Sequence, residues 1–434
     1  MILPPSHPQR LELNDEVHAR PPEALAAPLR LTYLALLADP ARRDASFEAV
    51  ADLARRSAIP PPLPGASHVS ADFGPFRLKW ERHTEFSRIM VITPGADAAD
   101  PFASPAIDAL PPDWVQALPG RLLVATHLAL LPAGEADPDT LAARLFAGNG
   151  LIGGTMSGGA ARVFTDFRIH GGFSRVLVED IRTTPRQAGR LIQRLLEIDT
   201  YRMLALLALP LARELGAPIT ASERRLAEIT EALVTARSAD EPELLESLTR
   251  LAAETESREA RTLYRFSASE AYDALVQRRI AELREGRMEG MQTLQEFMER
   301  RLAPAINTCR AMAARQDALS RRVARATQLL STRVDLTREQ QNQVVLANMD
   351  RRAQLQLRLQ ETVEGLSVAA ITYYIVGLVA YVAKGLKAGG LHLDVDLVTG
   401  IAIPVVAILV AFGIRQFRHL ATKRTRFVTP PAGR

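Results

Sequence analysis

The chain has 434 residues, of which 47% are hydrophobic and 24% charged, and its length predicts two or three structural units. The net charge of +4 is too small to indicate nucleic-acid binding. A single cysteine, Cys309, excludes an intrachain disulfide and a cysteine-based zinc site.

The first eight residues, MILPPSHP, contain neither a basic nor an apolar signal-peptide region, so we expect no signal for export of the soluble part. Residues 1–184 combine expected strands with Pro-rich connections. The run FRLKWERHTEFSRIMVIT (76–93) predicts a β-hairpin that turns near His83. The run RLLVATHLALL (121–131) predicts a buried strand.

A second hairpin is predicted for residues 161–170 and 173–180, because Gly171-Gly172 between them is a two-residue turn signal. The glycine-rich stretch just before it, GNGLIGGTMSGG (148–159), has no lysine and is followed by a strand instead of a helix. A phosphate-binding loop needs a helix N-terminus at that point. We therefore interpret 148–159 as a flexible turn where backbones approach closely.

Two groups of charged residues in these hairpins are candidate sites. Glu81, His83 and Glu85 alternate along a strand, beside Arg82, and such side chains can share a face. An acid–base or metal site is one interpretation, and solvated hairpin charges are the favoured one. A looser second group comprises Asp166, His170, Glu179 and Asp180.

No catalytic or cofactor motif is present: the sequence lacks GxSxG, a Walker loop, HExxH and a dinucleotide fingerprint. We assign no catalytic and no cofactor-binding residue, and the sequence does not tell whether a cofactor or a metal is bound. The soluble-domain candidates are Glu81, His83 and His170, for an ion or small ligand that the sequence does not identify.

Residues 185–365 are predicted to be helical, with helices over 185–214, 221–237 and 241–285. Strands before 184 and helices after it are the α+β pattern. The stalk, residues 287–364, has a coiled-coil-like seam from 302 to 330, and packing inside a helical bundle or an oligomer is an equal alternative to a two-stranded coiled coil. One seam position is taken by Leu302, Cys309, Gln316, Val323 and Leu330, and the other by Ala305, Met312, Leu319 and Ala326.

Within the stalk, Thr337 and Gln340 have the spacing of a capping box, which predicts that a new helix starts there. That helix carries Leu355, Leu359 and Leu366 at helical spacing and continues into an apolar run. A polar helix continuous with a membrane helix would link the soluble part mechanically to the membrane.

Two runs near the end of the chain, 366–383 and 397–414, each contain eighteen residues without a charge. An apolar helix of about 17–25 residues crosses a bilayer, so both runs predict transmembrane helices, although Pro404 interrupts the second. The Gly-rich link, 384–396, is short enough to require a hairpin. Residues 366–414 are therefore expected to be a transmembrane hairpin in the lipid bilayer.

The basic tail, residues 415–434, carries six basic residues and no acidic one, whereas Lys384 and Lys387 in the loop are offset by two aspartates. The positive-inside rule therefore predicts cytoplasmic N- and C-termini. Inside the first run, Tyr373 and Tyr374 lie where a hydroxyl needs a partner or a water-lined path. With Ser367 and Lys384, they are candidates for lining a pore or for packing between helices.

Several blocks of the sequence resemble the bacterial domain-of-unknown-function 3422 family, whose members are described as predicted membrane-anchored proteins. The resemblance implies a bacterial inner-membrane protein and no activity. The blocks are LNDEVHARPPEAL (13–25), LKWERHTEFS (78–87), LLEIDTYRMLALLALP (195–210) and MDRRAQLQLRLQETVEGLSVAAITYYIVGLVAYVAKG (349–385).

The order of parts is also similar to that of CorA-type divalent-cation channels, which carry a Gly-Met-Asn motif after the first span. Here the matching place reads Tyr-Val-Ala-Lys-Gly (381–385), and Lys384 would repel cations. Three hypotheses follow. The leading one is a membrane-anchored homo-oligomer whose cytoplasmic part binds a partner or senses a ligand; the others are a CorA-like channel and a membrane-tethered enzyme.

Overall fold

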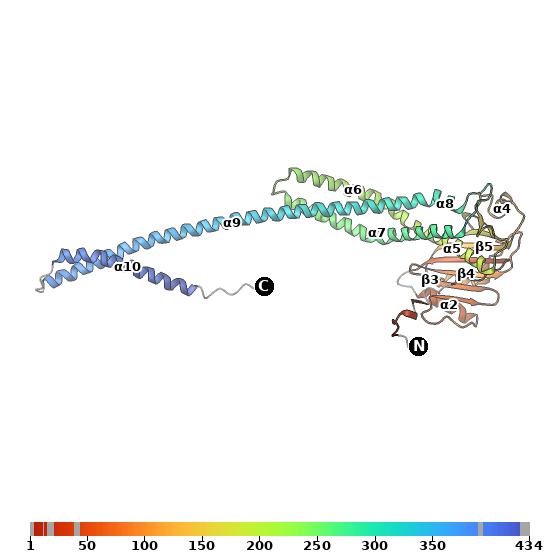
Figure 1. The fold of residues 1–434 in the computed structure, drawn as a ribbon, viewed down its shortest axis with the longest axis horizontal. Coiled ribbons are helices and arrows are strands. Elements are labelled where there is room, and N and C mark those ends of the chain that lie inside the picture. The colour runs from red at the N-terminus through yellow and green to blue at the C-terminus, as the bar shows by residue number, and fades with distance from the viewer. Residues whose placement is uncertain (1–3, 12, 15–20, 39–43, 389–393, 426–434) are drawn as a thin grey trace. The chain divides into compact units, whose positions relative to one another are not determined.

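The computed structural model describes residues 4–11, 13–14, 21–38, 44–388 and 394–425. The chain divides into two compact units, Met1–Leu329 and Leu330–Arg434. The first contains a sheet, the helices on its two faces and a set of long helices (Figure 1).

Within the described residues, eight strands form one sheet. The strands are β1 Leu29–Leu37, β2 His68–Asp72, β3 Arg77–Arg82, β4 Phe86–Pro94, β5 Arg121–Pro132, β6 Ile152–Met156, β7 Ala161–His170 and β8 Phe173–Asp180. Their order is β2-β3-β4-β1-β5-β8-β7-β6. Strands β5 and β8 pair in parallel, and the other neighbours pair antiparallel. The parallel pair arises because the chain after β5 first forms β6 and β7 at the edge and then returns beside β5.

The predicted hairpins are confirmed: β3 pairs with β4 and β7 with β8, both antiparallel, and β5 matches the predicted strand. The expectation of a flexible turn over 148–159 is wrong for its middle part, which is strand β6. Close backbone approach is the reason for its glycines. A Cβ on Gly153 would lie 2.0 Å from the Val163 carbonyl oxygen, and one on Gly154 would lie 2.4 Å from that of Gly286.

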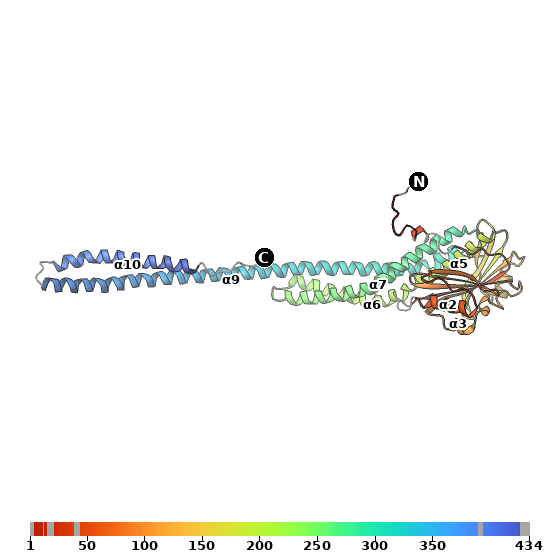
Figure 2. The same cartoon turned by 90° about the horizontal axis from the view of Figure 1, so that it is seen from below.

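Helices cover both faces of the sheet, as Figure 2 shows, so the core has two layers of side chains. The helices of this unit are α2 Ala45–Arg56, η2 Ala106–Ala109, α3 Pro112–Gln116, α4 Pro138–Leu145, α5 Pro185–Leu206, α6 Ala208–Thr235, α7 Glu241–Leu283 and α8 Leu294–Arg301. On one face, α5 and α7 bury a large cluster that includes Leu31, Tyr33 and Leu128. On the other face, α2, η2 and α3 pack over Trp80, and α4 packs over Phe164.

Helix α5 begins with a capping box in which Thr184 and Gln187 satisfy each other's backbone N–H groups, and Pro185 occupies its first turn. The predicted break between 214 and 221 is wrong: α5 ends at Leu206, and α6 continues through Pro218 to Thr235. Residues 205–208 are buried or half-buried against the sheet core, so tertiary packing ends the helix eight residues before the predicted end at 214.

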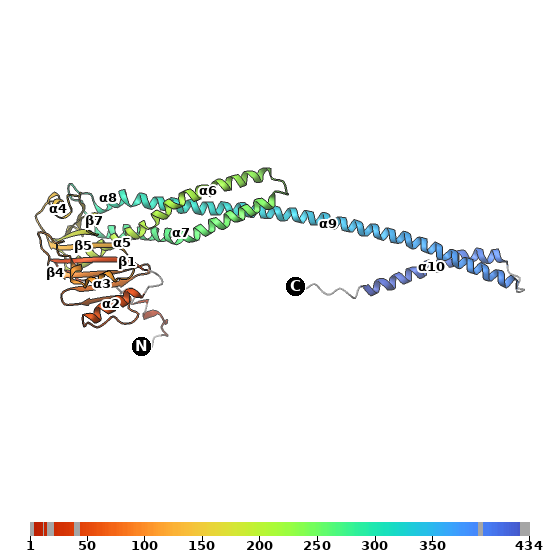
Figure 3. The ribbon, with the colours of Figure 1, turned by 180° about the vertical axis from the view of Figure 1, so that it is seen from behind.

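Helix α9 extends over Ala303–Ala388, and its first part lies beside α6 and α7 (Figures 1 and 3). The seam residues Leu302, Cys309, Gln316 and Val323 are buried, as predicted. Gln316 bonds Thr262 of α7 at 3.3 Å, and Arg315 bonds Glu223 of α6 at 2.9 Å. The seam up to Val323 therefore has partners within the same chain.

The predicted helix start at Thr337 is wrong, because α9 is continuous there and the Thr337 hydroxyl donates to the Arg333 carbonyl, one turn back. A capping box acts only where preceding residues leave the helix, and no Gly or Pro makes them do so here. The second unit contains the remainder of α9 and α10, Val395–Thr425.

By length and composition alone, three helical segments of the described chain are apolar enough to cross a membrane: Pro185–Thr235, Leu294–Ala388 and Val395–Ile414. They differ in how much of their most apolar window is buried. That share is 33% in the first segment, 6% in the second and 0% in the third. The first segment is apolar because it includes α5, whose apolar face packs on the sheet.

Candidate functional site

A cluster of buried charges lies between strands β3 and β4 and helix α5. Side chains alternate along a strand, so Lys79 and Glu81 of β3 face α5, while Leu78 and Trp80 face the opposite layer. Lys79 is 5% exposed and Glu81 is fully buried. Charged residues are almost never fully buried unless they are paired, so the partners of Glu81 define this cluster.

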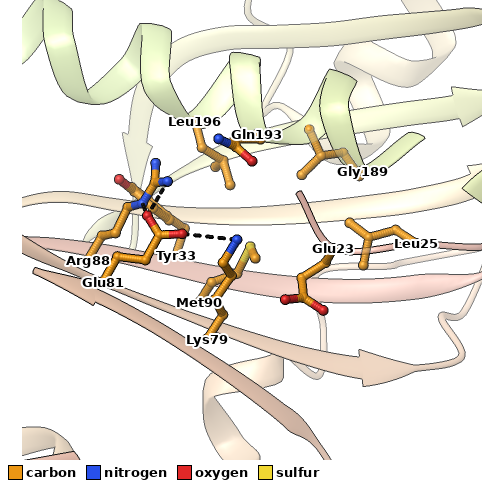
Figure 4. A pocket seen from close by; sticks show the side chains of 11 residues that line it. Glu23, Leu25, Tyr33, Lys79, Glu81, Arg88, Met90, Gly189, Gln193 and Leu196 are labelled. Atoms are coloured by element: carbon orange, nitrogen blue, oxygen red, sulfur yellow. Dashed lines mark hydrogen bonds and ion pairs between the residues drawn. The ribbon is translucent and has the colours of Figure 1, made fainter. Parts of the chain in front are cut away.

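Glu81 is held by two cations and a histidine. Arg88 lies directly opposite on β4, and its Nε donates to Glu81 Oε2 at 2.5 Å. Lys79 Nζ lies 2.9 Å from Glu81 Oε1 (Figure 4). His83 Nε2, at the hairpin turn, is 3.6 Å from Oε2, and its ring stacks on Phe86. The sheet register therefore places these groups around one carboxylate.

Glu197 of α5 continues the cluster on the helix side. It accepts hydrogen bonds from Gln193 Nε2 at 2.8 Å and from Arg279 Nε of α7 at 2.5 Å. Arg88 Nη1 lies 3.5 Å from the same carboxylate. Positively and negatively charged side chains thus alternate across three layers: the strands, α5 and α7. In order they are Lys79, Glu81, Arg88, Glu197 and Arg279.

The N-terminal strap, residues 21–28, closes one side of the cluster. Lys79 Nζ donates to the Pro21 carbonyl at 2.5 Å, and Arg77 pairs with Glu23 at 3.2 Å. Leu25 N–H donates to the Pro185 carbonyl at the start of α5. Gly189 allows the contact, because a Cβ there would lie 1.7 Å from the Glu23 carbonyl oxygen.

A small cavity remains beneath the strap, as Figure 4 shows. The volume open to the centre of a water molecule is about 20 Å³, enough for one ordered water. Gln193 Oε1 and Glu81 Oε1, both buried, are acceptors that such a water could bond. The lining combines these polar atoms with apolar side chains: Leu25, Met90, Ile192 and Leu196.

The electrostatics keep Glu81 and Arg88 ionised. Burial by itself would raise the pKa of Glu81, but the nearby His83 and the charges of Arg88 and Lys79 lower it to about 2. Burial opposes the charge on Arg88, and Glu81 overcomes that effect and raises the Arg88 pKa. Burial raises the pKa of Tyr33, whose hydroxyl bonds Thr200 at 2.7 Å. Glu81 is thus ionised near neutral pH and connects β3 to β4 through Arg88.

The preference for solvated hairpin charges is therefore wrong for Glu81. The other members of that hairpin group have separate partners. Arg82 pairs with Asp44 at 2.5 Å. Glu85 accepts from Arg265 at 2.5 Å and from the Tyr272 hydroxyl at 2.7 Å, both on α7. The hairpin turn is thus fastened to α7, which sequence proximity alone could not indicate.

His170 lies in a different place. Its Nε2 is 2.8 Å from Asp166 Oδ2, and Asn149 donates to the same oxygen. Strand β7 is five strands from β3 in the sheet, about 24 Å at about 4.8 Å per strand. Glu179 pairs instead with Arg162, and Asp180 bonds Thr183. The structure joins Glu81 with His83 and keeps His170 apart from both.

Sequence reasoning missed the partners of Glu81, Lys79 and Arg88, and the continuation of the cluster through Glu197 and Arg279. Period-2 alternation could have placed Lys79 with Glu81, and a hairpin register could have placed Arg88 opposite. Glu197 and Arg279 had no such signal, because they reach the sheet only through packing of α5 and α7. Among the described residues, no group of three or more His, Cys, Asp or Glu side chains could hold a metal ion.

A larger groove lies between α7 and the first part of α9. Its volume open to water centres is about 310 Å³, and its floor includes Phe266, Ile306 and Cys309. Gln316, 3% exposed, lies at its edge and bonds Thr262. Burial raises the pKa of the Cys309 thiol, which makes it a poor nucleophile.

The four candidates in the apolar runs lie on α9. The Ser367 hydroxyl donates to the Val363 carbonyl at 2.9 Å, so it is satisfied within the helix. The rings of Tyr373 and Tyr374 meet edge to face, 6.0 Å apart, and are 78% and 72% exposed. Lys384 is also exposed. The four residues do not converge on one point of the helix.

Comparison with known proteins identifies one relationship. The sequence model of a family described as "Protein of unknown function (DUF3422)" matches residues 5–421. No curated protein matches the chain. No solved structure matches it either, so the likeness to CorA-type channels gains no support.

Proposed function

We propose a membrane-anchored binding or sensing protein as the function of this chain, which belongs to the DUF3422 family of proteins of unknown function. Two apolar helical segments near the end of the chain hold it in the bilayer. The first unit lies on the cytoplasmic side and engages a partner or ligand, and the protein works as a homo-oligomer.

The observation that carries this proposal is the exposure of the apolar runs. Within 366–383, Leu366 is 67% exposed and Leu378 is 65% exposed. Within 397–414, Ile408 is 69% exposed and Phe412 is 64% exposed. Soluble proteins rarely expose apolar surface of this extent, whereas lipid tails are a suitable solvent for it.

The hairpin topology has independent support. Figures 1 and 2 draw α10 running back alongside the end of α9, as a short loop requires. Ala383 at that end of α9 is 4% exposed, and small or β-branched residues such as Ala402 and Val406 are half-buried. Small side chains at a helix–helix contact are typical of membrane helices. The excess of basic residues in the tail supports a cytoplasmic location for both ends of the transmembrane hairpin.

The first unit is suited to transmit a binding event. The cluster around Glu81 and Glu197 joins the strap, the sheet, α5 and α7 by hydrogen bonds of 2.5–2.8 Å. A ligand or partner that displaces the strap would break the Lys79–Pro21 and Arg77–Glu23 contacts. Such a change would reach α7 through Arg88, Glu197 and Arg279.

The anchor is tested by placing charges where lipid is proposed. Leu378→Arg with Ile408→Arg, one in each apolar run, is compared with Leu346→Arg with Leu357→Arg, since all four side chains are 53–69% exposed. An arginine in mid-membrane costs about 2.5–3.5 kcal/mol for insertion, whereas one in water costs little. We expect the first pair to release the full chain into the soluble or alkaline-carbonate fraction and the second pair to leave it in the membrane. Equal behaviour of the two pairs would refute the anchor.

A further inference from the structure

Beyond residue 334, α9 has a stripe of mainly apolar side chains that nothing in the described chain covers. At about 100° per residue, its six positions fall within about 80° of one another around the helix. Four of them are apolar and 56–69% exposed. The stripe is defined by Val345, Asn348, Arg352, Leu355, Leu359 and Val363, at spacings of three and four.

In the first part of α9, the apolar seam is buried by neighbouring helices. From Leu302 to Val323 the seam is buried, and α6 and α7 of the same chain supply the contacts. From Asp335 to Leu366, by contrast, nearly every side chain of α9 is exposed. An isolated helix in water has marginal stability, and most helices are stabilised by packing of an apolar face. The stripe therefore requires a partner helix.

We propose that the stripe binds the same stripe of a second copy of this chain, in parallel and in register. This inference rests on the proposed membrane anchor, because two chains held by the same spans present their α9 helices in the same direction. Membrane anchoring also confines the copies to a plane and raises their effective concentration.

The charges beside the stripe favour a parallel second copy. Arg351 and Arg358 lie about 80–100° to one side of its midline, whereas Met349 and Gln356, on the other side, carry no charge. In a parallel pair, one flank of each helix faces the opposite flank of its partner, so the arginines lie beside uncharged residues. In an antiparallel pair, identical flanks face each other, and the arginines of the two copies would repel one another.

Asn348 and Arg352 are the polar members of the stripe. A polar residue at a seam position, asparagine in particular, lowers the stability of a coiled coil and fixes its register and number of strands. In parallel copies in register the two Asn348 side chains meet, and each amide can donate to the other because it carries both a donor and an acceptor. The Arg352 guanidinium groups can reach outward because that side chain is long.

Cysteine cross-linking of the full chain in its membrane tests this arrangement. The two test variants are Val345→Cys and Leu359→Cys, which lie two heptads apart on the stripe. Each is exposed to a mild oxidant. Leu357→Cys, about 160° from the stripe around the helix, is treated in the same way as the control. Wild type controls for Cys309, which is buried. We expect both stripe variants to shift to twice the monomer mass, and Leu357→Cys and wild type to remain monomeric.

Membrane retention is measured on the same samples, so the two proposals fail separately. If the variants stay in the membrane and neither stripe position cross-links, the stripe is not an interface between copies. Cross-linking at only one stripe position, or equally at Leu357, would refute the parallel in-register pairing. Loss of the protein from the membrane in all variants and in wild type would refute the anchor, and with it the premise of this inference.

Discussion

At the scale of single residues, Glu81 illustrates how a buried charge couples stability to pH. Its pKa of about 2 in the folded protein lies below the ordinary value of 4.5, so the unfolded chain takes up this proton first as the pH falls. The ionised carboxylate therefore contributes fully above about pH 4.5, and this contribution is lost between about pH 4.5 and pH 2.

Glu81→Gln removes that carboxylate while keeping its size. Because Arg88 and Lys79 would remain buried without their counter-ion, we expect the variant to lose about 3–5 kcal/mol of stability at neutral pH. Urea denaturation of the detergent-solubilised chain measures this, and the difference from wild type should shrink below about pH 4.5. Glu246→Gln, in an exposed pair with Arg250, is the control and should change stability by less than about 1 kcal/mol. An equally small change in Glu81→Gln would contradict the role of the cluster.

Protonation of His127 should change folding stability in a different pH range from that of Glu81. Burial and then the nearby charge of Arg175 lower its pKa to about 4, and its ring stacks on Phe173 and bonds Thr32 at 3.0 Å. The unfolded chain binds this proton near pH 6.5, so folding stability falls as the pH decreases from about 6.5 to about 4. His127→Gln should flatten the stability profile across that window and leave the profile below it unchanged. Thermal midpoints at intervals across the window provide the measurement.

At the scale of elements, the strap depends on one helical glycine. Gly189→Ala would place a Cβ against the Glu23 carbonyl oxygen, so the strap must leave α5. We expect faster hydrogen exchange or proteolysis of residues 21–28 in this variant. Gly216→Ala in α6 is the matched control, because its nearest neighbour, Met312 Cε, is 3.9 Å away. Alanine is a better helix former than glycine by about 1 kcal/mol, so the control should be neutral or stabilised. Unchanged exchange of the strap in Gly189→Ala would show that the strap does not depend on this contact.

Elements also show where sequence patterns predict well and where they do not. The hairpins at 76–93 and 161–180 were predicted because alternation and a Gly-Gly turn are local signals. The end of α5 and the continuity of α9 were not predicted. Pro218 and the Thr337 box are local signals as well, but the helix-forming residues around them and the packing of α5 outweigh them.

At the scale of the whole molecule, the proposed topology puts the loop between the two transmembrane helices on the side of the membrane opposite the cytoplasm. Asp394→Cys should react with a membrane-impermeant maleimide in intact cells. Gln360→Cys should react only after the membrane is permeabilised, because the positive-inside rule places it in the cytoplasm. Both positions are exposed in the structure, so accessibility differs only through the membrane. The reverse pattern of labelling would invert the proposed orientation.

The sequence by itself determined the apolar runs, the strand hairpins, the helical seam of α9 and the family. These depend on periodicity and composition along a continuous stretch of chain. Only the tertiary structure decided that Glu81 is buried, that Arg88 links it to Glu197 and that His170 lies elsewhere. Burial of a charge depends on which distant side chains neutralise it, and that is fixed by strand register and by how α5 and α7 pack on the sheet.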